Sequence, residues 1–175
     1  EYVAPGWTQQ PQKGFDTMSY DFNADDVFEM AEQMERNGAK FYTTAASAVS
    51  DENAKNFLQR LADMEVDHEK TFKSMRTTLS DMEKASTVFD PQGESALYLR
   101  ALADTRVFFR KEMDVSSMEK ILKAAIEAEK DSIVFYLGMR EAVPDNLGKQ
   151  RLDDIIKEEM GHIRLLSKEL VQLKK

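Results

Sequence analysis

The chain has 175 residues, a length that fits one domain with a hydrophobic core of its own. It contains no cysteine, which excludes disulfides, thiolate catalysis, zinc ribbons and iron sites held by cysteine. Its net charge of −8 argues against a nucleic-acid-binding protein, for which a basic surface would be expected.

The composition also bears on location. No run of about 18 apolar residues occurs, so no membrane-spanning helix is expected. The first residues show no signal-peptide pattern. With the lack of cysteine, these features predict a protein of the reducing cytoplasm.

Residues 1–22 are predicted to form an irregular N-terminal arm, because prolines and glycines interrupt them and they show no helical period. Trp7, Phe15 and Tyr20 could hold this arm against the body of the protein or a neighbouring subunit, and a frayed tail is the alternative. Residues 23–175 are predicted to form the folded domain.

Two helices are predicted to follow the arm. Asn23 opens the first, which extends to about Ser50, and Asp51 caps the second, which extends to about Leu79. In both, small and apolar residues recur at alternating spacings of three and four, the pattern of a helix packed in a bundle. The inward faces are Phe28, Ala31, Glu35, Gly38, Tyr42, Ala45 and Val49, then Leu58, Leu61, Glu65, His68, Phe72, Met75 and Leu79.

Residues 80–115 form a long connection, which Pro91 and Gly93 interrupt and in which residues 95–111 are predicted to form a short extra helix. A third helix follows, with a capping box of Ser116 and Glu119, and Pro144 ends it. A fourth begins near 145 or 146 and extends almost to the C-terminus. The inward faces are Met118, Leu122, Ala125, Glu129, Ser132, Tyr136, Met139 and Val143, then Leu152, Ile155, Glu159, His162 and Leu166.

No useful stretch shows the alternation of a β-strand, so the predicted fold is all-α: a four-helix bundle whose long connection can cross from one end to the other. The chain also repeats itself. A shift of 94 residues places Glu35 on Glu129, and it superimposes the helices without a gap. The same shift places Glu65 on Glu159 and His68 on His162. Amphipathic helices resemble one another in their leucines, but such likeness does not readily explain three matched polar residues.

These six polar residues lie at positions that would otherwise call for apolar side chains. Four unpaired carboxylates in one core would be costly, so either the helices are rotated from the predicted phase or positive charge lies between them. Two divalent cations would balance the four carboxylates. Carboxylates with one imidazole for each ion suit iron or manganese, and zinc would also bind. The predicted metal ligands are Glu35, Glu65, His68, Glu129, Glu159 and His162.

In the expected arrangement, Glu65 and Glu159 bridge the ions, Glu35 and Glu129 each bind one ion terminally, and each histidine completes one ion. The neighbouring Glu158 falls off the inward face and is expected in solvent. Tyr42 and Tyr136 lie two turns beyond the terminal glutamates. They could hydrogen-bond to the carboxylates or simply pack in the core, and the pattern does not separate these two roles.

The stretches MERNGAKFY, MEVDHEK, EAEKDSIVFY and EEMGHIRLL together resemble the rubrerythrin branch of the ferritin-like superfamily, over about residues 24–172. The resemblance implies a ferritin-like bundle with two iron ions that cycle between Fe²⁺ and Fe³⁺, and that react with hydrogen peroxide or dioxygen. It also implies a homodimer. Two features depart from the family. Rubrerythrins carry a cysteine-rich rubredoxin domain, which this chain lacks, and a further carboxylate where this chain has Ser132.

Because that domain is missing, electrons would have to come from a separate rubredoxin-like protein or a reductase. The function predicted is a di-iron peroxidase or oxidase that acts against oxidants. The alternatives are a ferroxidase that passes iron to storage, a di-iron hydroxylase of an organic substrate, and a helical bundle whose metal is structural.

Overall fold

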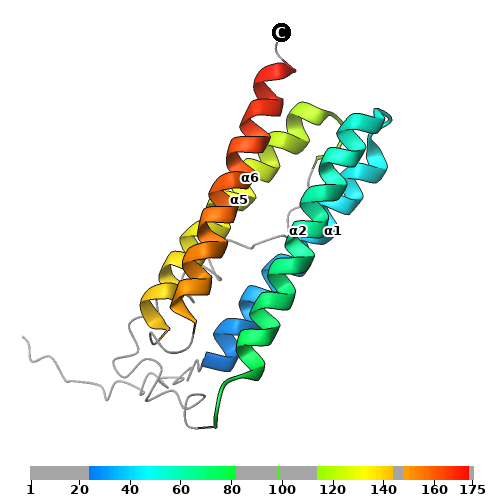
Figure 1. Cartoon of the computed structure of the whole chain (residues 1–175). Helices are drawn as coiled ribbons and strands as arrows, with labels where there is room; N and C mark the ends of the chain where they lie inside the picture. Colours follow the sequence, from blue (N-terminus) through cyan, green and yellow to red (C-terminus); the bar gives the residue numbers. More distant parts are fainter. Residues whose placement is uncertain (1–23, 82–97, 99–113, 144–147, 174–175) are drawn as a thin grey trace, which may run out of the picture.

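A computed structural model of the chain describes residues 24–81, 98, 114–143 and 148–173. Four long helices make up this part: α1 (Ala24–Ala48), α2 (Glu52–Thr77), α5 (Met118–Ala142) and α6 (Lys149–Gln172). They pack as a bundle and the described residues include no strand (Figure 1), so the predicted all-α four-helix fold is confirmed. None of the described helices is long and apolar enough to cross a membrane.

The four helices form two antiparallel pairs, α1 with α2 and α5 with α6 (Figure 1). Hydrogen bonds of Tyr42 to Glu129 and of Tyr136 to Glu35 show that α1 also runs antiparallel to α5. Hence α2 and α5 point the same way, and the end of α2 lies at the opposite end of the bundle from the start of α5. The chain between them has to cover the length of a helix, about 39 Å at 1.5 Å per residue. This agrees with the predicted crossover connection.

The arm at 1–22, the helix start at Asn23 and the short helix predicted at 95–111 lie outside the described residues, apart from Tyr98. The second predicted cap is present, since the side chain of Asp51 accepts a 2.7 Å hydrogen bond from the Ala54 N–H. Helix α5 ends at Ala142, two residues before Pro144, as expected for a residue that cannot continue a helix.

The predicted capping box at the start of α5 was wrong by one residue. Ser117 is the N-cap, and its hydroxyl accepts from the Lys120 N–H at 3.3 Å. Ser117 has the extended backbone of a cap (φ −153°, ψ 151°), which directs its hydroxyl at the amide three residues on. The N–H of Ser116 instead donates to Asp114, so Ser116 lies one position outside the helix.

The predicted start of α6 near 145 or 146 was also wrong. The helix begins at Lys149, because Gly148 has φ 100°, a left-handed conformation that an α-helix cannot contain. A Cβ at this position would lie 2.8 Å from Cε of Met75. Glycine therefore serves here both for its backbone conformation and for the close approach of α2.

The core of the bundle consists of two apolar layers with a polar layer between them. The polar layer is formed by the middle turns of all four helices. One apolar layer includes Phe28, Phe72, Phe135, Met139, Leu152 and Ile155. The other includes Phe41, Leu58, Leu61, Ile121, Leu122 and Leu166. The predicted inward faces are thus buried, apart from Val49 and Met118, which are partly buried.

Candidate metal centre

The polar layer contains all six predicted metal ligands. Glu35 comes from α1, Glu129 from α5, and each of α2 and α6 contributes a Glu and a His at a spacing of three. Because residues three apart share one face of a helix, each such pair points the same way into the bundle. Every one of the six is at most 4% exposed: Glu35, Glu65, His68, Glu129, Glu159 and His162. The helix phases predicted from the spacing therefore agree with the structure.

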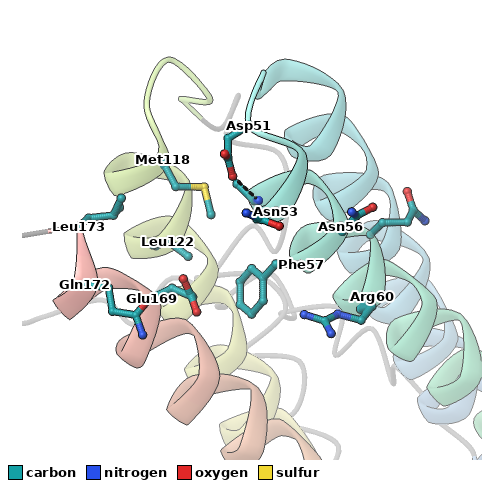
Figure 2. Close-up of a pocket in the computed structure, with 12 residues that line it drawn as sticks. Asp51, Asn53, Asn56, Phe57, Arg60, Met118, Leu122, Glu169, Gln172 and Leu173 are labelled. Carbon is teal, nitrogen blue, oxygen red and sulfur yellow. Dashed lines mark hydrogen bonds between the residues drawn. The ribbon is translucent and has the colours of Figure 1, made fainter.

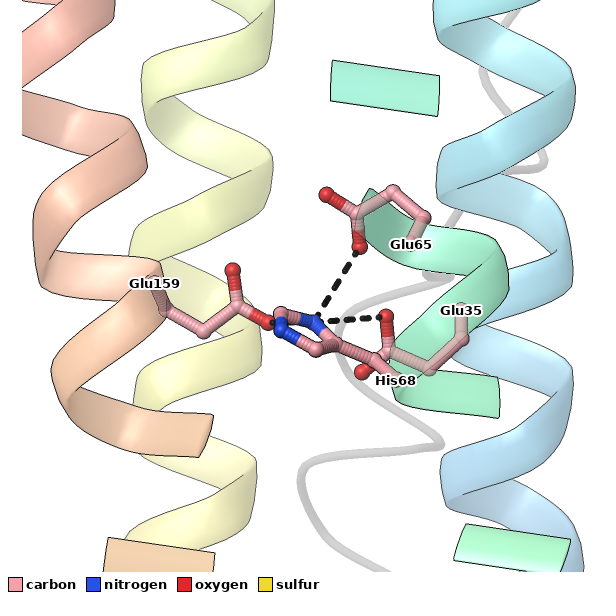
Figure 3. Close-up of side chains that lie close together, drawn as sticks. All are labelled: Glu35, Glu65, His68 and Glu159. Carbon is pink, nitrogen blue, oxygen red and sulfur yellow. Dashed lines mark ion pairs between the residues drawn. The ribbon is translucent and has the colours of Figure 1, made fainter. Parts of the chain in front are cut away.

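The first group surrounds Nδ1 of His68 (Figure 3). This atom lies 3.1 Å from Oε1 of Glu159, 3.6 Å from Oε2 of Glu35 and 3.9 Å from Oε2 of Glu65. One donor atom from each of these four residues lies within 4.8 Å of the others. Three helices, α1, α2 and α6, thus converge on one small volume.

The second group surrounds Nδ1 of His162 in the same manner. The distances are 3.0 Å to Oε2 of Glu159, 3.3 Å to Oε1 of Glu65 and 3.5 Å to Oε1 of Glu129. These four donor atoms also lie within 4.8 Å of one another. Here the contributing helices are α2, α5 and α6.

Glu65 and Glu159 belong to both groups, and each directs its two oxygens to different groups. Oε2 of Glu65 faces His68 and its Oε1 faces His162. For Glu159, Oε1 faces His68 and Oε2 faces His162. The two imidazole rings are stacked with centroids 5.6 Å apart. Glu65 and Glu159 thus each present one oxygen to each group, which is the placement that their predicted bridging roles require.

Atoms without hydrogen-bond partners cluster at the same place. Among the described residues, buried side-chain atoms with no partner include Oε1 of Glu65, both oxygens of Glu159, Nδ1 of His68 and both ring nitrogens of His162. Buried polar atoms are rarely left unpartnered in proteins. Carboxylate oxygens and imidazole nitrogens are atoms that can bind a metal, so the donor set fits two cations between the helices.

The pKa values show how far the metal-free layer departs from ordinary chemistry. Burial opposes charge on both imidazoles, but the carboxylates close to each ring outweigh it and raise the pKa of His68 and of His162 to about 12. Burial also raises the pKa of Glu35, Glu65 and Glu129. Without metal the layer is therefore held together by protons on the imidazoles and on part of the carboxylates.

Glu159 differs from the other three glutamates. Burial alone would raise its pKa, but the two imidazoles beside it, His162 and His68, prevail and hold the pKa of this carboxyl below its usual range. Its carboxylate lies between the two imidazoles, close to Nδ1 of each. Glu159 is thus the central anion of the layer.

The two tyrosines hydrogen-bond to carboxylates. The hydroxyl of Tyr42 donates to Oε1 of Glu129, and that of Tyr136 donates to Oε1 of Glu35. Each tyrosine therefore reaches the glutamate of the opposite helix, and not the one that precedes it on its own helix. Burial and the neighbouring carboxylates raise the pKa of both phenols, which keeps the hydroxyls protonated as donors.

Two contacts were not predicted from the sequence. Glu158 is more than half exposed, as expected for a residue off the inward face, yet its Oε2 lies 2.9 Å from Nε2 of His68. Gly38, one turn after Glu35, faces Glu65 so closely that an added Cβ would lie 3.3 Å from its Cγ and Oε2. The spacing places Gly38 on the inward face, but only the packing of α1 on α2 shows which side chain it accommodates.

A separate open pocket of about 740 Å³ lies at one end of the bundle, between the start of α2, the start of α5 and the end of α6 (Figure 2). Phe57 and Arg60 of α2 and Glu169 of α6 are among its lining residues, and none of the six predicted ligands is. This pocket is therefore distinct from the polar layer.

Comparison with known proteins agrees with this arrangement. Residues 9–76, which include α1 and nearly all of α2, match the family model described as Rubrerythrin. A solved structure of a ferritin-like diiron-carboxylate protein from Thermotoga maritima is similar to this chain, with a TM-score of 0.63 and 24% sequence identity. The similarity covers 85% of this chain and 94% of that one, and at this identity it shows the fold. Comparison with curated protein sequences gives no match.

The predicted resemblance to rubrerythrin is therefore confirmed at the level of sequence over residues 9–76, and the fold over most of the chain is that of the ferritin-like structure. The 175 residues contain no cysteine, so they include no iron site of the rubredoxin kind.

Proposed function

We propose that the polar layer binds two iron ions, and that the protein is a di-iron redox protein of rubrerythrin type that reacts with hydrogen peroxide or dioxygen. The observation that carries this proposal is the pair of buried four-residue groups that share Glu65 and Glu159. The unpartnered atoms of both groups support it, as does the family match over residues 9–76.

In this proposal each ion is held by three carboxylates and one imidazole. Two divalent cations balance four carboxylates when both imidazoles are neutral, so the buried layer carries no net charge. Oxygen-rich ligands with one nitrogen suit iron and manganese, and zinc can substitute. When bound, the iron pair would supply the electrons that reduce the oxidant by changing between Fe²⁺ and Fe³⁺.

The protein's own residues have three tasks. Glu65 and Glu159 hold the two positions at a fixed separation, since each directs one oxygen to each group. Tyr42 and Tyr136 orient the terminal carboxylates through their hydroxyls and retain their protons because their pKa is raised. The apolar layers on both sides keep water from the site, which strengthens electrostatic interactions within it.

The electron donor is proposed to be a separate protein, a rubredoxin-like partner or a reductase. The chain contains no cysteine and so cannot itself hold an iron centre of the rubredoxin kind. Each turnover with peroxide takes up two electrons, which that partner would have to supply.

Anaerobic titration with Fe²⁺ tests the proposal. We expect binding to saturate at about two ions per chain, followed by a near-ultraviolet absorption of ferric iron on mixing with H₂O₂ or O₂. Faster oxidation by peroxide than by O₂, and turnover when a reductase is added, would support the peroxidase function. Retention of many more than two irons per chain in air would indicate iron storage instead.

Variants of the site provide the control. Glu159→Ala and His162→Ala should each lower the amount of iron bound, because each removes a ligand. Glu127→Ala should leave it unchanged, since Glu127 lies on the exposed side of α5, paired with Lys130. If Glu159→Ala and His162→Ala bind two ions as tightly as the unchanged protein, the proposed site is wrong.

A further inference from the structure

The two histidines of the polar layer differ in the partner of Nε2, the ring nitrogen that points away from the four buried glutamates. Nε2 of His68 lies 2.9 Å from Oε2 of Glu158. Nε2 of His162 is buried and has no hydrogen-bond partner. His162 is fully buried, with 0% of its surface exposed, so solvent does not replace the missing partner.

The internal repeat shows where this difference originates. The 94-residue shift that relates Glu65 and His68 to Glu159 and His162 places Glu158 on Met64. The residue before each bridging glutamate is thus a carboxylate on α6 and a thioether on α2. A thioether sulfur is only a weak acceptor, so α2 cannot offer His162 what α6 offers His68.

This difference matters once a cation binds. A metal ion on Nδ1 leaves the ring proton on Nε2, which then needs an acceptor. For His68 the acceptor is Glu158, which fixes the ring with Nδ1 toward Glu35, Glu65 and Glu159 and makes the imidazole a more basic ligand. For His162 the Nε2 proton would remain buried without a partner, which weakens binding.

We propose that the two positions of the proposed metal site are unequal, an inference that rests on the proposed function. The position completed by His68 binds a divalent cation more tightly than the one completed by His162. Glu158 is a positioning residue for His68. The polar layer then holds two cation positions of different affinity. The first cation binds beside His68 and the second beside His162.

Anaerobic titration of the full chain with Co²⁺ alone, followed by its visible absorption, tests this order. The unchanged protein should bind two ions in two resolved steps. Glu158→Ala should weaken the tighter step by roughly 10- to 100-fold, the usual effect of losing a hydrogen bond to a ligating imidazole, and leave the weaker step in place. Glu158→Gln should restore most of the lost affinity, because its amide oxygen accepts the same bond.

The variant Met64→Glu tests the other half of the repeat, because it places a carboxylate at the position equivalent to Glu158. It should strengthen the weaker step and leave the tighter one unchanged, because it supplies His162 with an acceptor in the equivalent place. Glu158 and Met64 are not among the six ligands, and Glu158 is exposed, so folding should tolerate both changes.

Crystals loaded with one equivalent of Co²⁺ assign each step to a position by anomalous scattering. We expect the ion beside His68 in the unchanged protein, and a shift of occupancy toward His162 in Glu158→Ala. Equal occupancy of both positions in the unchanged protein, or equal weakening of both steps in Glu158→Ala, would overturn the inequality. Failure of the unchanged protein to bind two ions at all would instead overturn the proposed function.

Discussion

Glutamates and histidines occupy the centre of this bundle, where leucine would pack without cost. In the metal-free protein their charges are compensated by one another: imidazolium groups lie beside Glu159, and burial raises the pKa of the three other glutamates. Such a layer lowers stability relative to an apolar core, and the two cations that we propose to bind there would offset this loss.

The raised pKa values predict how the stability of the metal-free protein depends on pH. Both histidines have a pKa near 12 when folded and near 6.5 when unfolded, so their stabilising effect is complete below 6.5 and is lost as pH rises toward 12. The three glutamates with raised pKa also lower the stability of the folded state as pH rises above 4.5. Glu159, whose pKa is lowered, instead stabilises the folded state as pH rises, but this gain is already complete above pH 4.5.

The free energy of unfolding should therefore fall between pH 6.5 and 8.5, by up to about 1.4 kcal/mol per pH unit for each proton retained. Urea unfolding with a chelator present measures it. The double variant His68→Gln, His162→Gln should show a smaller slope. A stability that rises over this interval would contradict the protonation described here.

Gly38 predicts a second effect at the level of a single residue. Alanine normally stabilises a helix relative to glycine by about 0.5–1 kcal/mol, but at Gly38 the added Cβ would press on the carboxyl group of Glu65. We expect Gly38→Ala to weaken binding of both cations, because Glu65 faces both histidines. The measurement is the anaerobic Co²⁺ titration.

Gly161 on α6 is the matched control. Its added Cβ would meet only the end of Arg164, at 3.6 Å. Gly161→Ala should therefore raise the melting temperature and leave the affinity for cations unchanged. Metal binding by Gly38→Ala as tight as that of the Gly161→Ala protein would show that Glu65 has more room than the structure indicates.

At the level of helices, the two pairs of the repeat are alike at the site and different elsewhere. Arg76 at the end of α2 pairs with Asp25, Glu29 and Glu32 of α1, at 2.7 to 3.4 Å. The 94-residue shift places Arg76 on Leu170 and Glu32 on Ile126, so the second pair has no such network. The two pairs are therefore alike in the polar layer and differ at these outer positions.

Helix caps provide a prediction at this level. Asp51→Ala should lower the free energy of unfolding by about 1 kcal/mol, since it removes the 2.7 Å bond to the Ala54 N–H at the start of α2. Ser117→Ala should cost less, because its bond to Lys120 is longer, at 3.3 Å. Urea unfolding of both variants tests the order, and a larger loss for Ser117→Ala would reverse it.

At the level of the whole molecule, the polar layer joins the two helix pairs. Ligand groups from α1 and α2 face those from α5 and α6, and the Tyr42–Glu129 and Tyr136–Glu35 hydrogen bonds also connect the pairs. Cations bound here would therefore hold together helix pairs that are far apart in the sequence.

Removal of metal should accordingly destabilise the protein as a whole. Each ion present at about 100 times its dissociation constant adds about 2.7 kcal/mol to the free energy of unfolding. Calorimetry with and without a chelator should show a single transition that moves to lower temperature when metal is removed. The Glu159→Ala protein should melt at the same temperature in both conditions, and a metal-dependent shift in that variant would point to a different binding site.

The sequence by itself determined the helical fold and the inward position of six glutamates and histidines, because both depend on a period that can be read along the chain; that these six residues bind metal stays a prediction. Alternating spacings of three and four specify which side of each helix is buried, and the repeat shows that the polar residues on those sides correspond. The homodimer, the cytoplasmic location and the separate electron donor stay predictions.

Only the tertiary structure decided which residues of different helices meet. It showed that each tyrosine reaches the glutamate of the opposite helix, that Gly38 accommodates Glu65, and that exposed Glu158 bonds to His68 while His162 has no equivalent partner. It also moved the start of α6 to Lys149, where a left-handed glycine approaches Met75. Contacts of this kind depend on the rotation and separation of packed helices, which no spacing within a single helix specifies.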